Sequence, residues 1–399
     1  MQGNENAVPS LPQRKNGGKQ RVKPELNIGL LGFGAMGKAH AYCINTLDFY
    51  YTSLPFRARI FGICTTSEEK SSKIGEQFHI PVTCANEDAL IYDPNISIID
   101  VCTPNCYHYD TVKKALAAGK HVYCEKPLCV TVSQARELAE LAEKSGKICN
   151  MVFNNRHLAP VLRAAELVRE GRIGRLLSFS AEYLHNSCTD TLRPAGWKQD
   201  REICGGGVLF DLGSHVIDLI YSLCGEFHSV YGMSQIAYPQ RTGRQGQPWE
   251  TNADEGFYML CRMKSGAMGT ITVSKLIKGA NDDLSFSLYG EKGCLKFSLM
   301  QPNYLYFYDA TNPQTPLGGN SGYQAIECVG RYPAPGGAFP SPKAASGWLR
   351  GHVESMYQFL SSVYDGQQRS PSFADGAYVQ AVMEAAYRSS EQQKEILLP

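Results

Sequence analysis

Two short segments of the 399-residue sequence carry side chains of the kind that handle a proton and a hydride. The first is Glu125-Lys126-Pro127, which directly follows an apolar run that we expect to be a buried strand. A lysine at the carboxyl end of a parallel strand points into the crevice where open α/β sheets bind ligands. The alternative is a surface lysine in a tight turn. Because Pro127 fixes the backbone beside it, we favour a ligand site.

The second segment places a carboxylate and an imidazole after three consecutive glycines. Gly205–Gly207 allow a ligand or another backbone segment to approach closely. Asp211 and His215 are four residues apart, so on a helix they share one face. A carboxylate beside an imidazole supports its protonated form, which suits a group that must take a proton from an alcohol. Such a pair is more often structural, but the glycines and Lys126 favour catalysis here.

A glycine-rich stretch near the start of the chain has the spacing of a dinucleotide-binding turn. Gly32, Gly34 and Gly37 follow an apolar run at residues 26–31 and precede a helical pattern. The first glycine allows a tight turn, the second lets backbone N–H groups approach a pyrophosphate, and the third lets the helix pack against the sheet. We predict that a nicotinamide dinucleotide contacts the whole turn, namely Gly32, Phe33, Gly34, Ala35, Met36 and Gly37.

The end of the second predicted strand bears on which dinucleotide binds. Folds that prefer NAD usually place Asp or Glu there, on the ribose 2′-hydroxyl. This chain has Cys64-Thr65-Thr66-Ser67, with Lys70 one turn into the next helix. The hydroxyls and the lysine could bind the 2′-phosphate of NADP, or Thr65 could hydrogen-bond the ribose hydroxyls of NAD. We expect NAD and leave NADP open.

The overall composition is typical of a globular protein with a small-molecule ligand. The chain is 43% hydrophobic and 19% charged, and it is long enough for two packed domains. A net charge of +1 offers no basic surface for nucleic acid. The apolar runs are far shorter than the roughly 20 residues of a membrane span, and residues 1–25 lack the apolar core of a secretory signal. We expect a cytoplasmic protein that binds neither nucleic acid nor membrane.

Fourteen cysteines are an unusual number, and most of them lie inside apolar runs. In a chain of this size without an export signal, buried free thiols are expected rather than disulfides. Cys102, Cys106, His108 and Cys124 would be the candidate ligands of a zinc ion. They lack paired C-x-x-C spacing, so we expect no metal site.

Strands that alternate with helices dominate the first part of the chain, which indicates βαβ units and a parallel sheet. We predict strands at 26–31, 59–64, 81–84, 96–102, 121–124 and 147–153, with helices at 35–47, 68–78, 86–92, 107–118 and 133–145. Residues 25–150 therefore form a dinucleotide-binding domain. Residues 1–24 are polar, and we expect a disordered arm or one used in subunit contacts.

The second part, residues 151–399, has the alternation and turn signals of antiparallel hairpins. After a helix at 159–170 we predict strands at 175–184, 255–263, 267–275, 283–289 and 294–299. Residues 310–346 are rich in Pro and Gly and predict a long surface loop. Helices at 349–363 and 374–391 close the chain, and we expect the last helix to pack back toward the first domain. We assign this part to substrate binding and oligomerisation.

Taken together, these motifs resemble the Gfo/Idh/MocA oxidoreductase family, in order and spacing, from about residue 25 onward. The resemblance rests on the glycine turn, Thr103-Pro104-Asn105 with His108, Glu125-Lys126-Pro127 and the Gly-Gly-Gly…Asp211…His215 segment. It implies an α/β fold, with an N-terminal Rossmann domain and a C-terminal α/β domain that has a large open, mostly antiparallel sheet. It also implies a homo-oligomer, because an open apolar face needs covering.

The resemblance also implies roles for individual residues. Lys126, Asp211 and His215 match the catalytic residues of the family. The cofactor-side loop is matched by Thr103, Pro104, Asn105 and His108, and Glu125 and Lys126 border the nicotinamide. Thr65 stands where the family usually has the acidic residue that binds NAD, so this contact is in doubt here.

Finer features resemble the family's branch of levoglucosan and gut-bacterial C-glycoside 3-dehydrogenases. These features are an aromatic loop at 49–55, Phe153-Asn154-Asn155-Arg156, Trp197 and residues 371–376. For the sugar pocket, aromatic faces stack on a pyranose while amide and guanidinium groups donate to hydroxyls. The candidates are Asn155, Arg156, His185 and Trp197. The alternatives are an ion pair for Arg156, a surface position for His185 and a core position for Trp197.

The hypothesis is oxidation of a secondary hydroxyl of a sugar or glycoside at C3, with hydride transfer to the nicotinamide. His215 would take the hydroxyl proton, Lys126 would hydrogen-bond the same oxygen, and Asp211 would orient His215. One alternative is a redox-neutral glycosidase that oxidises C3, eliminates the aglycone, adds water and reduces again. Another is an inositol-type polyol dehydrogenase. A sensor or repressor would not need Lys126 and His215, and both are present.

Overall fold

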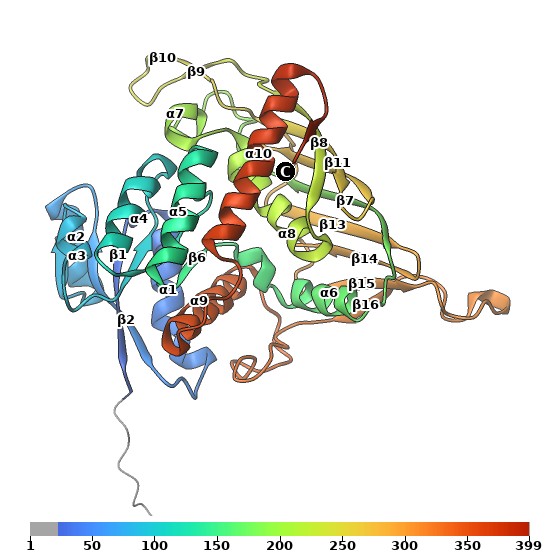
Figure 1. Cartoon of the computed structure of the whole chain (residues 1–399), viewed down its shortest axis with the longest axis horizontal. Coiled ribbons are helices and arrows are strands. Elements are labelled where there is room, and N and C mark those ends of the chain that lie inside the picture. The colour runs from blue at the N-terminus through green and yellow to red at the C-terminus, as the bar shows by residue number, and fades with distance from the viewer. Residues whose placement is uncertain (1–22, 399) are drawn as a thin grey trace, which may run out of the picture.

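The computed structural model describes residues 23–398, which form two large β-sheets, a small two-stranded sheet and the helices that pack around them (Figure 1). The predicted arm over residues 1–24 lies outside the described residues apart from its last two positions. The predicted α/β class, with one parallel sheet and one large, mostly antiparallel sheet, is confirmed.

The first sheet is parallel and has the strand order β3-β2-β1-β4-β5-β6. Its strands are β1 (Glu25–Leu31), β2 (Arg57–Cys64), β3 (Val82–Cys84), β4 (Ile98–Val101), β5 (His121–Cys124) and β6 (Cys149–Met151). Its helices are α1 (Ala35–Tyr50), α2 (Glu68–Phe78), α3 (Asp88–Ile91), α4 (His108–Ala117) and α5 (Val132–Ser145). The order reverses between β1 and β4, so the crevice at the carboxyl ends of these strands is where such a sheet binds its ligand.

Burial explains why the apolar runs become strands of this sheet. In β4 all four residues, Ile98–Val101, are buried, and in β1 Ile28, Leu30 and Leu31 are buried. Strands covered by helices on both faces read as continuous apolar runs rather than as alternating patterns. For this reason the first domain is the easier half of the chain to predict.

The second sheet is mixed and has the order β16-β15-β14-β13-β7-β12-β11-β8-β17, in which β7 and β12 are the one parallel pair. The strands are β7 (Leu176–Leu184), β8 (Phe227–Gln235), β11 (Gly256–Met263), β12 (Met268–Ser274), β13 (Asp283–Gly290), β14 (Gly293–Ser298), β15 (Tyr304–Asp309), β16 (Gln324–Glu327) and β17 (Ile396–Leu397). A separate hairpin is formed by β9 (Gln240–Thr242) and β10 (Pro248–Glu250).

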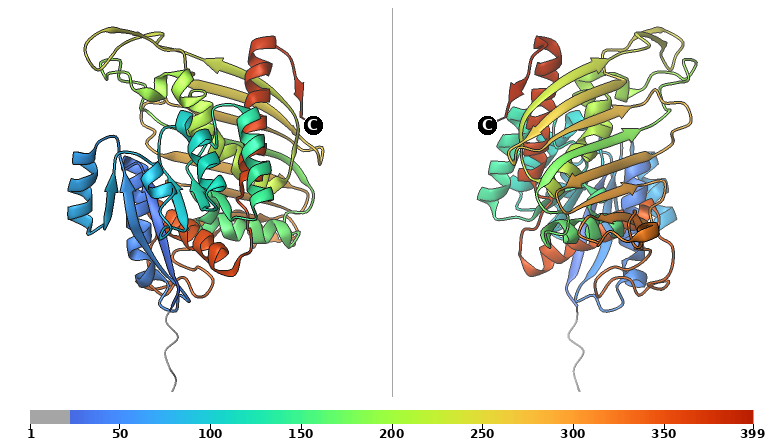
Figure 2. Two further views of the ribbon diagram at one scale, coloured as in Figure 1. Left: turned by 60° about the vertical axis from the view of Figure 1, so that its left-hand side comes forward. Right: turned by 90° about the vertical axis from the view of Figure 1, so that its right-hand side faces the viewer.

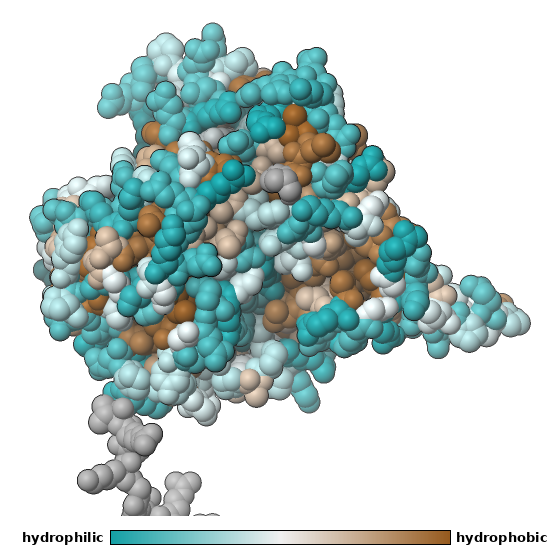
Figure 3. All heavy atoms as spheres, viewed as in Figure 1, coloured by the Kyte–Doolittle hydropathy of each residue, from teal (hydrophilic) through white to brown (hydrophobic). Residues whose placement is uncertain are grey.

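One face of this sheet is covered by helices and the other is open (Figure 2). The helices of the second part are α6 (Ala159–Arg169), α7 (Arg201–Cys204), α8 (Ser214–Cys224), α9 (Trp348–Asp365) and α10 (Phe373–Gln392). The last helix, α10, packs against both α5 of the first domain and β8 of the second sheet. On the face seen in Figure 3, hydrophilic side chains surround separate apolar patches.

Several elements of the second part are not predicted. They are the helices α7 and α8 and the strands β8, β9, β10, β15, β16 and β17, of which β16 lies within the predicted loop at 310–346. The aromatic stretch at 49–55 is partly core rather than an open loop. Tyr51 is fully buried and stacks on Tyr357 of α9, with ring centroids 3.9 Å apart.

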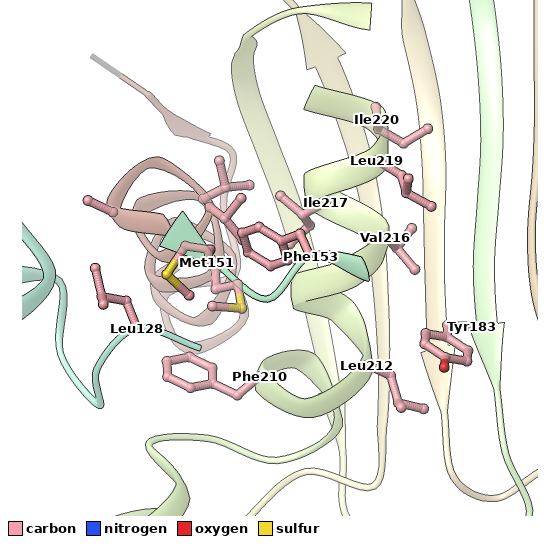
Figure 4. Close-up of a cluster of buried hydrophobic side chains, with 14 of the residues drawn as sticks. Leu128, Met151, Phe153, Tyr183, Phe210, Leu212, Val216, Ile217, Leu219 and Ile220 are labelled. Carbon is pink, nitrogen blue, oxygen red and sulfur yellow. The ribbon is translucent and has the colours of Figure 1, made fainter. Parts of the chain in front are cut away.

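One large apolar cluster contains residues of both domains. Figure 4 shows Met151 and Phe153, from the end of the first sheet, beside Phe210 and Ile217 of the second domain. The segment Arg201–Cys224 is long and apolar enough to cross a membrane by composition alone. However, 83% of its most apolar window is buried inside the protein, as in a core helix. The shared core fixes one domain against the other.

We expect Phe153→Ala to destabilise the protein by about 3–5 kcal/mol, because it removes a fully buried ring from this shared core. Urea unfolding followed by circular dichroism measures the change. Tyr92→Ala is the matched control, since the Tyr92 ring is 62% exposed, and its effect should stay within about 0.5 kcal/mol. Equal effects of the two substitutions would show that the cluster does not hold the domains together.

Candidate active site

The glycine turn lies at the mouth of a cavity of about 790 Å³ beside the end of β1. Gly32 has φ +91°, and a Cβ there would lie 2.6 Å from the carbonyl oxygen of Cys102. A Cβ on Gly37 would lie 2.2 Å from the Gly32 carbonyl oxygen, so this glycine serves helix packing and does not line the cavity. Gly34 lines the cavity and has open space around it. The turn therefore fits a dinucleotide whose pyrophosphate meets the N-terminus of α1.

The far end of this cavity is lined by Thr65 and Lys70, as predicted for the adenosine ribose, and also by Glu87 and Lys114. The Thr65 hydroxyl donates to the Ser67 carbonyl oxygen and lies 2.9 Å from the Ser71 hydroxyl. Polar groups are therefore available for the ribose end of a dinucleotide. Thr103, Pro104 and Asn105 line the same cavity.

His108 does not line the cofactor cavity, unlike the rest of its predicted loop. Its ring is buried, with nitrogens 2.9 and 3.0 Å from the carbonyl oxygens of Thr103 and Pro127. Burial lowers the pKa of His108. The residue ties the cofactor loop to the segment that carries Lys126.

Glu125 is held by a buried imidazole that the sequence analysis did not single out. His40 Nδ1 lies 2.9 Å from the Asp100 carboxylate, and His40 Nε2 lies 3.2 Å from Glu125 Oε1. Burial opposes the charge on Glu125, but the neighbouring His40 imidazole outweighs it and brings the pKa of Glu125 to about 2. Side chains from helix α1, from β4 and from the end of β5 are thus linked in one charged group, and Glu125 is the residue that precedes Lys126.

Asp211 lies at the centre of three lysines. Its carboxylate oxygens are 2.8 Å from Lys198 Nζ, 2.9 Å from Lys275 Nζ and 3.2 Å from Lys126 Nζ. Lys126 Nζ also donates to the Asp211 backbone oxygen at 2.5 Å. Burial alone would raise the pKa of the carboxyl, but the three ammonium groups outweigh it and hold the pKa well below its usual range. The carboxylate stays ionised and fixes the position of Lys126.

The predicted partnership between Asp211 and His215 is wrong in its geometry. Leu209–Gly213 forms a π-helical turn rather than an α-helical one. In such a turn a spacing of four residues does not align two side chains on one face, as the prediction for Asp211 and His215 assumed. The Asp211 carboxylate binds the three lysines, and among the described residues it makes no hydrogen bond to the His215 imidazole. Asp211 therefore orients Lys126, not His215.

His215 lies in a largely apolar setting next to Lys126. It packs edge-on against Phe153 and Tyr183, with ring centroids 6.2 and 6.0 Å away. Burial, followed by the charge of Lys126, lowers its pKa to about 3. Its Nδ1 has no hydrogen-bond partner among the described residues. The imidazole is therefore neutral at neutral pH, which is the form that can accept a proton.

A second cavity of about 620 Å³ adjoins the first and is lined by Lys126 and His215. Six residues line both cavities and mark the place where two ligands would meet: Met36, Glu125, Lys126, Trp197, Lys198 and Asp211. The volume lies within the usual range of roughly 300–1,000 Å³ for small-molecule sites.

Two of the four predicted sugar-pocket residues line this second cavity and two do not. His185 and Trp197 line it, and His185 Nε2 lies 2.9 Å from Asp282. Arg156 instead forms a buried ion pair with Asp218 at 2.5 Å, so its guanidinium is engaged away from the cavity. Asn155 is buried outside the lining, and the cavity is lined by its neighbour Asn154.

A histidine and a tryptophan that no sequence motif indicates line the cavity from the C-terminal part of the chain. His352 is 2% exposed, and neither of its ring nitrogens has a hydrogen-bond partner among the described residues. Burial, then the charge of His40, lowers its pKa to about 3. Trp348 packs on the same ring with centroids 4.2 Å apart. Both residues belong to α9, which no local motif connects to Lys126.

Two family models match the chain. A model described as an oxidoreductase family with an NAD-binding Rossmann fold matches residues 26–153, and a model of the GFO/IDH/MocA C-terminal domain matches residues 161–296. Together they cover more than half of the sequence. The first agrees with NAD as the cofactor of the glycine turn.

Similar proteins include two characterised sugar dehydrogenases. The chain is 27% identical over 387 residues to levoglucosan dehydrogenase of Pseudarthrobacter phenanthrenivorans, and the alignment covers 94% of this chain and 98% of that protein. It is 24% identical over 360 residues to glucose-6-phosphate 3-dehydrogenase of Bacillus subtilis, covering 90% and 94%. The solved structure of levoglucosan dehydrogenase with NADH and levoglucosan matches with a TM-score of 0.89 and 27% identity, covering 94% of this chain and 100% of that one. The predicted resemblance is confirmed.

The pKa values of His215 and His352 predict that stability falls as the pH falls. Unfolded histidine takes up a proton near pH 6.5, whereas these two rings stay neutral in the folded state down to about pH 3. Between these values the unfolded state binds more protons, and each ring lowers the free energy of unfolding by about 1.4 kcal/mol per pH unit. Urea unfolding at several pH values from about 6.5 to 5 measures this slope.

His352→Gln should reduce the dependence of the free energy of unfolding on pH by the contribution of one ring, about 1.4 kcal/mol per pH unit. His228→Gln, at an exposed position of β8, is the matched control and should leave the slope unchanged. If the free energy of unfolding of the unmodified protein did not change between these pH values, the buried, neutral state of both rings would be contradicted.

Proposed function

The chain belongs to the Gfo/Idh/MocA oxidoreductase family, and from that premise we propose that it oxidises a secondary hydroxyl of a sugar or glycoside at C3 with NAD. The observation that carries the proposal is that neutral His215 lines the second cavity together with Lys126, and that Lys126 also lines the cofactor cavity. The names of the similar levoglucosan and glucose-6-phosphate 3-dehydrogenases support a sugar and its C3 position.

In the proposed reaction Lys126 and His215 act on the same substrate oxygen. The Lys126 ammonium donates a hydrogen bond to this oxygen, and its position is fixed by the carboxylate and the backbone oxygen of Asp211. His215 takes the hydroxyl proton as the carbon–hydrogen bond of the carbinol breaks. When bound, NAD supplies the electrophilic ring carbon that accepts the hydride. Substrate hydroxyls offer partners to the unpaired nitrogens of His352, and Trp197 offers an apolar face.

We also propose a homo-oligomer that covers the open face of the second sheet. Exposed apolar side chains gather on neighbouring strands of this face, and Met233 of β8 lies directly opposite Tyr258 of β11. Leu260 on β11 and Met268 on β12 are also half exposed or more. An apolar face of this kind needs covering, and the mass of the protein in solution, from light scattering, tests the proposal.

We expect the purified protein to form NADH from NAD with a sugar or glycoside, and the product to be the 3-oxo sugar. Glucose, levoglucosan, myo-inositol and a C-glycoside, each supplied separately, define the substrate class. Release of aglycone without net NADH would replace this proposal with the redox-neutral glycosidase. Oxidation of myo-inositol alone would indicate a polyol dehydrogenase. Cofactor binding with no turnover of any of these sugars would contradict the proposal.

Substitution of the two acting residues should abolish turnover and spare the cofactor site. His215→Asn removes the proton acceptor and should lower kcat by about 10²–10⁴-fold. Lys126→Met removes a donor to the developing alkoxide and should cost about 10²–10³-fold. Calorimetric titration with NADH should still show binding. Exposed Lys278→Met and His228→Asn are the matched controls, and equal losses in variants and controls would contradict these roles.

A further inference from the structure

The second cavity carries more positive charge than the oxidation of a neutral sugar requires. Six cationic side chains line it, against three carboxylates, which are Glu125, Asp211 and Asp282. The cationic residues are Lys126, Arg193, Lys198, Arg241, Arg244 and Lys275. An imbalance of this kind inside a concave site attracts anions.

Most of these cations have an identified partner. The three lysines share the Asp211 carboxylate. Arg241 forms a buried ion pair with Glu255 at 2.5 Å and donates to the carbonyl oxygen of Cys188. Structural contacts therefore account for these four cations.

Arg193 and Arg244 are the exceptions. Neither guanidinium forms an ion pair or a side-chain hydrogen bond with any residue from 23 to 398. Both side chains are exposed and line the same cavity. Their two loops are joined by a hydrogen bond from Ala195 N to the Thr242 carbonyl oxygen, at 2.8 Å. Two unpaired guanidinium groups on adjoining loops thus border one space.

The cofactor does not explain these two arginines. They line the second cavity and are absent from the lining of the cavity that holds the glycine turn. Lys126 and Lys198, in contrast, line both. The arginines therefore border the substrate cavity and not the cofactor cavity. A pyrophosphate at the N-terminus of α1 is bound elsewhere.

Building on the proposed function, we propose that the substrate is an anionic sugar, with a carboxylate or phosphate group bound by Arg193 and Arg244. The planar guanidinium fork matches the oxygens of either group, and such charge-assisted hydrogen bonds are about twice as strong as neutral ones. The anionic group then lies at the outer end of the cavity, while the hydroxyl to be oxidised lies at Lys126 and His215. Charge selects the substrate at one end, and hydride transfer takes place at the other.

Matched substrate pairs test this proposal through initial rates of NADH formation. One arm compares phenyl β-D-glucoside with phenyl β-D-glucuronide, and the other compares glucose with glucose 6-phosphate. We expect kcat/KM to be at least about tenfold higher for the anionic member of one pair, which corresponds to about 1.4 kcal/mol. The pair that shows the preference identifies carboxylate or phosphate as the bound group.

Arg193→Gln and Arg244→Gln should each reduce that preference about tenfold, mainly through KM, because the neutral partner lacks the group that they bind. Arg136→Gln, at an exposed position of α5 outside both cavities, is the matched control and should keep the preference. A preference for the neutral sugars, or equal losses for both members of a pair, would overturn the anionic substrate while leaving sugar oxidation intact.

Failure of every sugar to react would count against the proposed function rather than against the anion site. Calorimetric titration of the NADH-bound protein with glucuronate and with glucose 6-phosphate then decides the second question. Binding that is lost in Arg193→Gln supports the anion site, and no binding of either anion by the unmodified protein overturns it.

Discussion

The active site depends on one carboxylate held among three ammonium groups. Asp211 comes from a π-helical turn, and its lysine partners come from three separate places: the end of β5, the segment before α7 and the end of β12. A carboxylate in this position would be costly to bury alone, and removal of one partner from such a group leaves an uncompensated charge. The contacts with Asp211 also fix the position of Lys126 Nζ, which extends from the first domain to the second. The apolar cluster around Phe153 and Ile217 packs the two domains against each other at this boundary, where the charges meet.

The division of labour between the two domains follows from this constraint. The first domain supplies the glycine turn, and its Glu125 is anchored through His40 to Asp100. The second domain supplies His215, whose burial keeps the imidazole neutral. Helix α9 then closes the substrate cavity with Trp348 and His352, although it follows Lys126 by more than two hundred residues. Each domain therefore contributes an incomplete site, and the packed interface completes it.

The sequence permitted a good account of the parts of the molecule whose causes are local. The glycine turn, the strand before Lys126 and the continuous apolar runs of the parallel sheet carry their physical reasons within a few residues. Contacts between residues that are far apart in the sequence could not be predicted from such local patterns. Nothing near Asp211 indicates Lys275, and the i, i+4 spacing to His215 suggested an α-helical face that the π-turn removes. Arg156 could bind either a sugar or an acid, and only the fold brings Asp218 to it. The strand β8 escaped prediction because its outer half is exposed and lacks a clear alternation.

The most direct test of the account follows the hydrogen that leaves the sugar. A substrate identified in the assay is labelled with deuterium at C3, and the cofactor is analysed by mass spectrometry after one turnover. If hydride passes from C3 to the nicotinamide while His215 takes the hydroxyl proton, the deuterium appears in NADH and the rate shows a primary isotope effect under single-turnover conditions. Deuterium that stays on the oxidised sugar, with unlabelled NADH, would contradict the central claim by placing the oxidation at another carbon.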